Sequence, residues 1–161
     1  MVMRLLVALT LNLSLFASST SAEGFGFAGL SFKTSAEELK KRYPKSSMVG
    51  NYMYLSEAES HHHIYGVEIP GGNSGGRLRL VFERSQNPGS PHQARYPSCQ
   101  QVLSIIQPRY GSPGKVEEFA EESSWNRRYS WTQQGEVLAL HCFRVKESFL
   151  AETLTITESA R

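Results

Sequence analysis

Two cysteines constrain the fold of this 161-residue chain more than any other pair of residues. The first, Cys99, lies in the segment Pro97–Gln107, whose apolar residues recur at i, i+3, i+4 and i+7, the spacing of one buried helix face. Pro97 suits a first helical turn, and Ser98 followed three residues later by Gln101 has the pattern of a capping box. Pro108 and Gly111 predict the end of the helix. The spacing therefore places Cys99 on the packed side of a helix.

The second cysteine, Cys142, lies in a predicted strand over Glu136–Val145, where it shares one face with Leu138 and Leu140. A catalytic thiol or a metal ligand is the alternative, but the chain has no CxxC motif and no third cysteine. We therefore predict a Cys99–Cys142 disulfide that packs the helix on the leucine face. By constraining the unfolded chain, such a bond contributes roughly 4 kcal/mol of stability.

The first 22 residues have the pattern of a secretory signal peptide: Arg4, an apolar run over Leu5–Phe16, and small residues at Thr20 and Ala22. The apolar run is shorter than the roughly 20 residues that span a bilayer. We predict cleavage after Ala22, a periplasmic or secreted location, and no integral membrane segment after cleavage. The remaining residues, 23–161, fit one domain.

Charge and composition exclude several classes of function. Lys and Arg number 17 against 15 acidic residues, a balance that argues against a nucleic-acid-binding protein, which has a clustered basic surface. All the acidic residues are glutamates. Calcium loops and most phosphoryl-transfer sites use aspartate at key positions, so we expect neither chemistry and no cofactor.

Alternating apolar and aromatic residues predict strands on both sides of the central helix. Overlapping capping boxes predict a further helix near Ser35, ended by Pro44. Residues 112–123 are interpreted as a polar link, and residues 85–95 as the crossing between halves. The predicted strands are Gly24–Phe32, Asn51–Leu55, His61–Ile69, Arg77–Glu83, Ser124–Thr132, Glu136–Val145 and Glu152–Thr157.

These elements predict an α+β fold with two helices packed on one face of a mainly antiparallel sheet of six to seven strands. The halves, about 23–87 and 96–161, each have a helix that ends in Arg-Tyr and then three strands. This parallel suggests an internal α-β-β-β duplication. The alternative is that a small α+β domain offers a helix and a meander twice without any duplication.

The sequence Gly72-Asn-Ser74-Gly-Gly76 resembles the nucleophile loop of chymotrypsin-like serine proteases. With no aspartate in the chain, the third member of a triad would have to be a glutamate. The chain after the signal peptide is also too short for the two barrels of that fold. We interpret the segment as a glycine-rich hairpin loop.

A histidine tract offers the best metal-ligand candidates. If residues 61–69 form a strand, His61 and His63 point to the same side, where their imidazoles could be two of the ligands of a zinc site. Zinc needs three or four ligands, and only the fold decides whether His92, His141 or a glutamate comes near. We predict no metal site.

One strand carries a stripe of residue types that dominate protein-binding hot spots. If the sheet face without helices is exposed, the stripe forms an aromatic binding surface together with two tyrosines of an earlier strand and with His141 or Phe143. The alternative is that the stripe belongs to the core. Alternation alone does not show which face of the sheet is exposed to solvent. The candidate binding residues are Trp125, Arg127, Tyr129, Trp131, Tyr52 and Tyr54.

Two segments carry a family resemblance. The sequence Gly-Leu-Ser-Phe-Lys-Thr-Ser-Ala-Glu-Glu-Leu at 29–39 and the run from Val102 to Pro113, ending Tyr-Gly-Ser-Pro, resemble the tandem helix-plus-antiparallel-sheet proteins of the bacterial envelope. That group includes the β-lactamase inhibitory protein type and the small outer-membrane-assembly lipoproteins. The chain departs from the lipoproteins because it has no cysteine at the predicted cleavage site. The resemblance implies a non-enzymatic, protein-binding role in the periplasm.

The sequence thus favours an exported, non-enzymatic protein-binding module, an inhibitor of or accessory to a secreted or envelope protein, whose partner is another protein. One alternative is a small periplasmic hydrolase or metal-binding protein that uses Ser74 or the histidines. A structural envelope protein without catalytic activity is the other.

Overall fold

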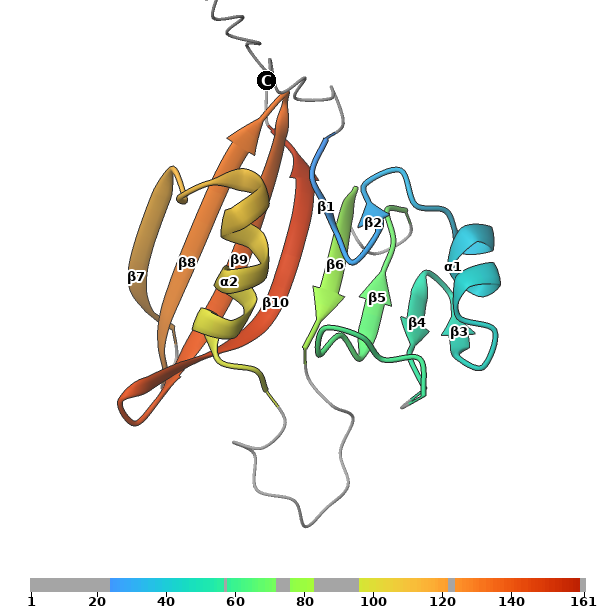
Figure 1. Cartoon of the computed structure of the whole chain (residues 1–161), viewed down its shortest axis with the longest axis horizontal. Helices are drawn as coiled ribbons and strands as arrows, with labels where there is room; N and C mark the ends of the chain where they lie inside the picture. Colours follow the sequence, from blue (N-terminus) through green and yellow to red (C-terminus); the bar gives the residue numbers. More distant parts are fainter. Residues whose placement is uncertain (1–23, 57, 72–75, 83–95, 122–123, 160–161) are drawn as a thin grey trace, which may run out of the picture.

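Eight antiparallel strands form one sheet in the computed structural model of this chain, in the order β3-β4-β5-β6-β10-β9-β8-β7 (Figure 1). The structure describes residues 24–56, 58–71, 76–82, 96–121 and 124–159. The strands are β3 (Ser47–Val49), β4 (Tyr52–Tyr54), β5 (Gly66–Glu68), β6 (Arg77–Val81), β7 (Lys115–Glu121), β8 (Ser124–Gln133), β9 (Glu136–Val145) and β10 (Ser148–Glu158). The predicted signal peptide (1–22), Ser74 and the predicted crossing at 85–95 lie outside the described residues.

A short hairpin at the start of the described chain forms a separate two-stranded sheet, β1 (Gly26–Phe27) and β2 (Leu30–Ser31). Its turn residues Ala28 and Gly29 have φ of 52° and 73°, a left-handed conformation that favours glycine. Phe25, Phe27 and Leu30 are buried. The hairpin therefore contributes core side chains and does not join the main sheet.

The helix α1 (Ala36–Arg42) begins as predicted, with a capping box between Ser35 and Glu38. The Ser35 hydroxyl accepts from the N–H of Glu38 (3.2 Å), and the Ser35 N–H donates to the Glu38 carboxylate (2.7 Å). Leu39 is the one buried residue of α1 among its seven. The helix lies beside β3 and β4 (Figure 1), so a single leucine anchors it to the core.

The longer helix, α2 (Cys99–Tyr110), has the predicted capping box between Ser98 and Gln101. Of the two predicted end signals, Gly111 is confirmed as the cap, whereas Pro108 lies within the helix, which continues to Tyr110. The N–H of Gly111 donates to the carbonyl of Gln107 (2.8 Å). Pro108 has no backbone N–H, so it removes one hydrogen bond from the last turn of the helix, and the other bonds of that turn remain.

The predicted disulfide between Cys99 and Cys142 is present and joins α2 to β9. The apolar faces that the sequence assigned to helix and strand meet around it. Cys99, Val102, Leu103 and Ile106 of α2 belong to the same buried cluster as Leu138, Leu140 and Cys142 of β9. No helix among the described residues is long and apolar enough to cross a membrane.

The predicted sheet of six to seven strands with two helices packed on one face was wrong. The sheet has eight strands, the first predicted strand is the separate hairpin, and β3 and β7 were missed. Four strands follow each helix, so the predicted α-β-β-β unit is also wrong. The edge strand β7 was missed because its sequence, Lys-Val-Glu-Glu-Phe-Ala-Glu, is rich in charge. Charged residues are typical of an unpaired edge strand, and here they obscure the apolar alternation.

Candidate binding face

Strand register shows which side of the sheet each predicted binding residue occupies. Across β8 and β9, Trp131 lies opposite Leu138, Tyr129 opposite Leu140, and Arg127 opposite Cys142. Directly opposed residues share a face, so this stripe is on the side of the disulfide and α2. The stripe therefore does not lie on the sheet face without helices, and of the two alternatives the register supports the one in which the stripe belongs to the packed side.

Three stripe residues make contacts within the domain. Trp131 is only 4% exposed, and its Nε1 donates to the carbonyl of Gly111 (2.9 Å) at the end of α2. The guanidinium of Arg127 bonds to the Glu118 carboxylate and to the Tyr129 hydroxyl, and it lies 4.0 Å from the centre of the Phe149 ring. Trp125, in contrast, is 52% exposed. The stripe is thus mainly part of the packed side, with one exposed end.

The two predicted tyrosines lie on the opposite face. Register through β4, β5 and β6 aligns Tyr54 with Gly66 and Val81, and Tyr52 with Glu68 and Arg79. The two rings are 4.6 Å apart. A Cβ on Gly66 would collide with the Tyr52 hydroxyl, which explains the glycine there. The six predicted binding residues therefore do not form one surface.

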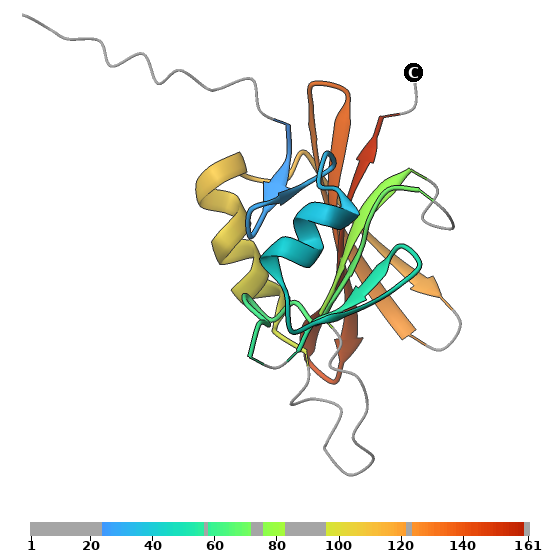
Figure 2. The ribbon, with the colours of Figure 1, turned by 90° about the vertical axis from the view of Figure 1, so that its right-hand side faces the viewer.

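The face opposite α2, here called the open face, is hollowed over the C-terminal half of the sheet. Figure 2 shows α2 and the β1–β2 hairpin on one side of the sheet, and none of the described helices lies on the other. A hollow of about 690 Å³, here called the trough, crosses β10, β9 and β8 between β6 and β7. The trough floor consists of small and hydroxyl side chains: Ser130, Thr132, Val137, Ala139, Thr153, Thr155 and Thr157.

A histidine–glutamate pair lies at one end of the trough. Nδ1 of His141 is 2.9 Å from Oε2 of Glu152, and this hydrogen bond holds the pKa of Glu152 below its usual value. The imidazole is stacked on Phe119, with ring centres 5.8 Å apart. Glu152 is the extra residue where the register of β10 shifts between Ala151 and Thr153, so a β-bulge places its carboxylate beside the imidazole.

A second hollow, of about 460 Å³, continues from this pair toward the other end of the strands. It is lined by Tyr96, Glu121, Asn126 and Phe143, and it shares His141 with the trough. The Nε2 atom of His141 is buried and has no hydrogen-bond partner among the described residues. The open face thus has a continuous concave surface on both sides of one imidazole.

The histidine tract is not on a strand. β5 begins only at Gly66, and His62 and His63 have left-handed φ values of 51° and 63° within a turn. The expectation that His61 and His63 project together from a strand was therefore wrong. Buried Ile64 ends the turn. No group of three or more His, Cys, Asp or Glu side chains that could hold a metal occurs in the described part of the chain.

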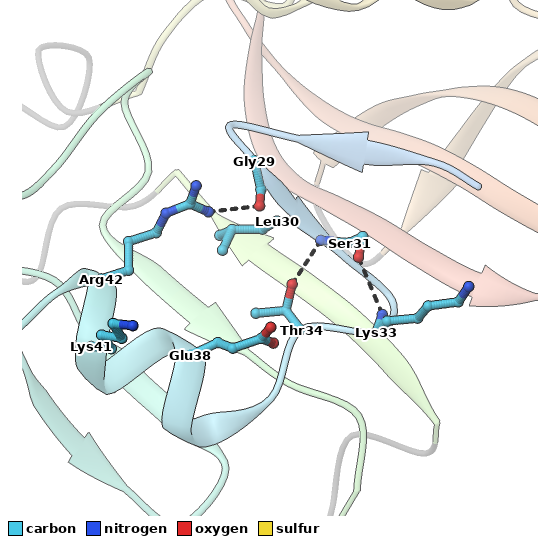
Figure 3. A pocket seen from close by; sticks show the side chains of 8 residues that line it. All are labelled: Gly29, Leu30, Ser31, Lys33, Thr34, Glu38, Lys41 and Arg42. Carbon is cyan, nitrogen blue, oxygen red and sulfur yellow. Dashed lines mark hydrogen bonds between the residues drawn. The ribbon is translucent and has the colours of Figure 1, made fainter. Parts of the chain in front are cut away.

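Another hollow, of about 510 Å³, separates the β1–β2 hairpin from α1 (Figure 3). Its polar groups hold the hairpin in place. Nη1 of Arg42 donates to the carbonyl of Gly29 (2.6 Å), and the Ser31 N–H donates to the Thr34 hydroxyl (2.9 Å). Because these donors already have acceptors within the chain, we interpret this hollow as a structural seam and the open face as the better binding candidate.

The prediction that His141 and Phe143 lie on the face without helices is confirmed, whereas the threonines of β10 were missed. In Thr153-Leu-Thr-Ile-Thr157 the threonines alternate with buried Leu154 and Ile156, which is the pattern of a strand with one hydroxyl-lined face. The tight turn at Gln134 and Gly135, both with positive φ, pairs Gln133 with Glu136 and so sets Trp131 opposite Leu138. The observed two-residue turn therefore fixes the face on which the stripe lies.

Comparison with protein-family models, curated proteins and solved structures finds no significant match to this chain. What the open face can do must therefore be inferred from its own residues.

Proposed function

We propose that this protein is a non-enzymatic binding module that holds another protein against its open face, as an inhibitor of or accessory to a secreted or envelope protein. The observation that carries the proposal is the trough, a hollow of about 690 Å³ on the sheet face where none of the described helices lies. The aromatic stripe no longer carries it, because Trp131 is buried.

The trough lies on the most firmly supported strands of the sheet. β8, β9 and β10 have 10, 10 and 11 residues, and each is paired on both sides. Behind them the Cys99–Cys142 disulfide fixes α2 to β9. A rigid scaffold of this kind lowers the entropy that a binding surface loses when it captures a partner.

The charged groups of the open face support binding more than catalysis. Lys115 and Glu117 form an ion pair (2.8 Å), as do Arg79 and Glu68 (3.5 Å). Because these charges pair with each other, the ion pairs leave neither partner as an isolated acid or base for catalysis. The hydrolase alternative depends on Ser74, which is outside the described residues.

We also propose that the protein acts outside the cytoplasm. Stable disulfides form in oxidising compartments, and the Cys99–Cys142 bond fits such a location. The predicted signal peptide and the resemblance to envelope proteins support the same proposal.

The test is affinity capture from an envelope and secreted extract with a matched pair of variants. Ala139→Tyr fills the trough floor with a large side chain that a strand tolerates. Val116→Ser alters an exposed residue of β7 on the opposite face. We expect wild type and Val116→Ser to retain the same partner and Ala139→Tyr to lose it, with unchanged melting temperatures. Equal capture by Ala139→Tyr would contradict the proposal.

A further inference from the structure

We infer that the trough receives an extended, acidic segment of the partner protein. This inference rests on the proposed function and adds the chemistry of what is bound. It follows from three features of the trough: the charges on its walls, the small Ala139 side chain on its floor and the spacing of its hydroxyl groups.

The trough walls carry more positive than negative charge. Arg77 on β6 forms one wall, Lys115 and Arg128 form the other, and Glu117 is the single carboxylate among the lining residues. Lys115 is paired with Glu117. The two arginines have no ion pair within the described residues, and the buried Nε of Arg77 has no hydrogen-bond acceptor there. Within the described chain, the trough therefore offers the Arg77 guanidinium without a carboxylate partner. Arg128 lies opposite Glu117, whose pKa is lowered first by its hydrogen bond with Lys115 and less by the Arg128 charge, so this guanidinium is shared with a carboxylate that Lys115 already pairs.

The Arg128 guanidinium is held in place by an aromatic ring. It lies 5.1 Å from the centre of the Phe119 ring, on the open face of β7. A stacked guanidinium loses less conformational entropy when it binds a carboxylate, and its planar fork matches a carboxylate with two parallel hydrogen bonds. This geometry favours Asp or Glu side chains as the groups recognised.

The floor favours an extended segment. Thr153, Thr155 and Thr157 follow one another at every second position of β10, which spaces their hydroxyls by about 6.7 Å. Alternate side chains of an extended peptide have the same spacing. Ala139 lies beside Thr155, and its small side chain leaves room for a main chain to approach. The Thr155 hydroxyl donates to the Ala139 carbonyl (3.4 Å) and can still accept from that main chain. The Thr153 and Thr157 hydroxyls can donate to it or accept from it.

The charge pattern disfavours a polyanion such as nucleic acid. Glu117 lies within the trough, and Glu121 and Glu152 line the adjoining hollow. A uniformly charged polymer that followed the open face would meet these carboxylates. A peptide can instead place its acidic residues at the two arginines and neutral residues elsewhere.

The test uses three fluorescein-labelled dodecapeptides that alternate Thr with Glu, Gln or Lys, measured by fluorescence anisotropy with wild-type protein. We expect the Thr–Glu peptide to bind at least about tenfold more tightly than the Thr–Gln peptide, and the Thr–Lys peptide to bind weakest. Salt at about 0.5 M should weaken the Thr–Glu complex, because exposed charges are then screened. Equal binding of the Thr–Glu and Thr–Gln peptides to wild type would overturn the inference whether or not any variant folds.

Variants locate the interaction. Arg77→Gln and Arg128→Gln should each weaken Thr–Glu binding by at least about fivefold. Arg144→Gln is the matched control, since Arg144 is exposed and bonds to the Lys146 carbonyl at the far end of β9. Arg77→Lys and Arg128→Lys keep the charge but lose the fork, so we expect intermediate affinity. An equal loss in Arg144→Gln, or tighter binding of a single-stranded oligothymidylate than of the Thr–Glu peptide, would overturn the inference.

Partner capture separates this inference from the proposed function. If Ala139→Tyr loses the partner while Arg77→Gln and Arg128→Gln both retain it, the open face binds a protein but not through acidic side chains, and only this inference fails. If Ala139→Tyr retains the partner, the proposed function fails as well.

Discussion

The two halves of the sheet have the same order of elements but differ in how they are held together. The strands β3 to β6 have three, three, three and five residues, whereas β7 to β10 have seven, ten, ten and eleven. The helix of the second half buries Cys99, Val102, Leu103 and Ile106, and that of the first half buries only Leu39. The C-terminal half is therefore the more strongly packed.

The N-terminal half uses side-chain hydrogen bonds where the other half uses strand ladders. The Glu59 carboxylate accepts from the Lys45 N–H (2.9 Å), the Ser46 hydroxyl (2.6 Å) and the Ser56 hydroxyl (3.2 Å). These bonds close the segments around β3 and β4 without long strands. The trough floor therefore lies on the C-terminal half, whose geometry depends on long paired strands and less on exposed loops.

Removal of the disulfide should have the largest effect on the difference in stability between the two halves. Replacing Cys99 and Cys142 with alanine should lower the free energy of unfolding by about 4 kcal/mol, because the unfolded chain regains the entropy of the closed loop. Denaturant unfolding measures the loss, and reduced wild-type protein is the control. Native-state hydrogen exchange should then show β8 to β10 no longer better protected than β4 and β5. If that order of protection is unchanged, the disulfide is not the source of the difference.

A substitution in α1 tests the other half. Leu39→Ala should cost about 2–4 kcal/mol, since it leaves a cavity at the only buried residue of the helix. Hydrogen exchange should show the loss of protection concentrated in α1, β3 and β4. Lys40→Ala, at an exposed position of the same helix, is the matched control and should change stability by less than about 0.5 kcal/mol. A uniform loss over the whole sheet would show that the halves unfold as one unit.

Two tryptophans on one face of β8 separate the packed part of the C-terminal half from its exposed end. Trp131→Phe should cost about 1–3 kcal/mol, because it removes the hydrogen bond to the Gly111 carbonyl and part of a buried ring. Trp125→Phe should stay within about 0.5 kcal/mol, since Trp125 is half exposed. Thermal melting of the two variants in parallel provides the measurement, and equal losses would contradict the burial difference.

The smallest expected effect is that of Glu152→Gln on the open face. The pKa of Glu152 is lower in the folded protein than its usual value of 4.5, so its stabilising contribution is present near neutral pH and is lost as the pH falls through the folded-state value. The partly exposed pair should contribute less than about 1 kcal/mol. Unfolding curves should therefore differ at pH 7 and converge well below pH 4.5.

Glu147→Gln is the control for this pH dependence, because its side chain is 94% exposed. A difference between Glu152→Gln and wild type that persists undiminished in strong acid would show that the glutamate stabilises β10 by packing and not by its charge.

Sequence analysis predicted this fold well where local chemistry decides the structure. Both capping boxes, the bounds of β9 and the disulfide are confirmed. It failed at β3, β7 and the histidine tract. These segments are exposed or short, so apolar alternation does not indicate whether they form strands. Contacts with residues distant in the sequence determine their structure.

The candidate binding face was harder to predict because both faces of β8 carry residues suited to an interface. Trp125, Arg127, Tyr129 and Trp131 alternate with Asn126, Arg128, Ser130 and Thr132. Hot-spot composition favoured the first set, but the packed side of a domain also selects large aromatic residues. Only the pairing of Trp131 with Leu138 distinguishes the two faces.

The pairing of β6 with β10 has a consequence for biosynthesis. β10 is the latest strand in the sequence, yet it lies in the middle of the sheet between β6 and β9. While the polypeptide is still being translated, β6 and β9 each have an unpaired edge. Both edges are covered only when Ser148–Glu158 arrives, so a nascent chain that stops before this strand leaves two edges that can pair with other chains.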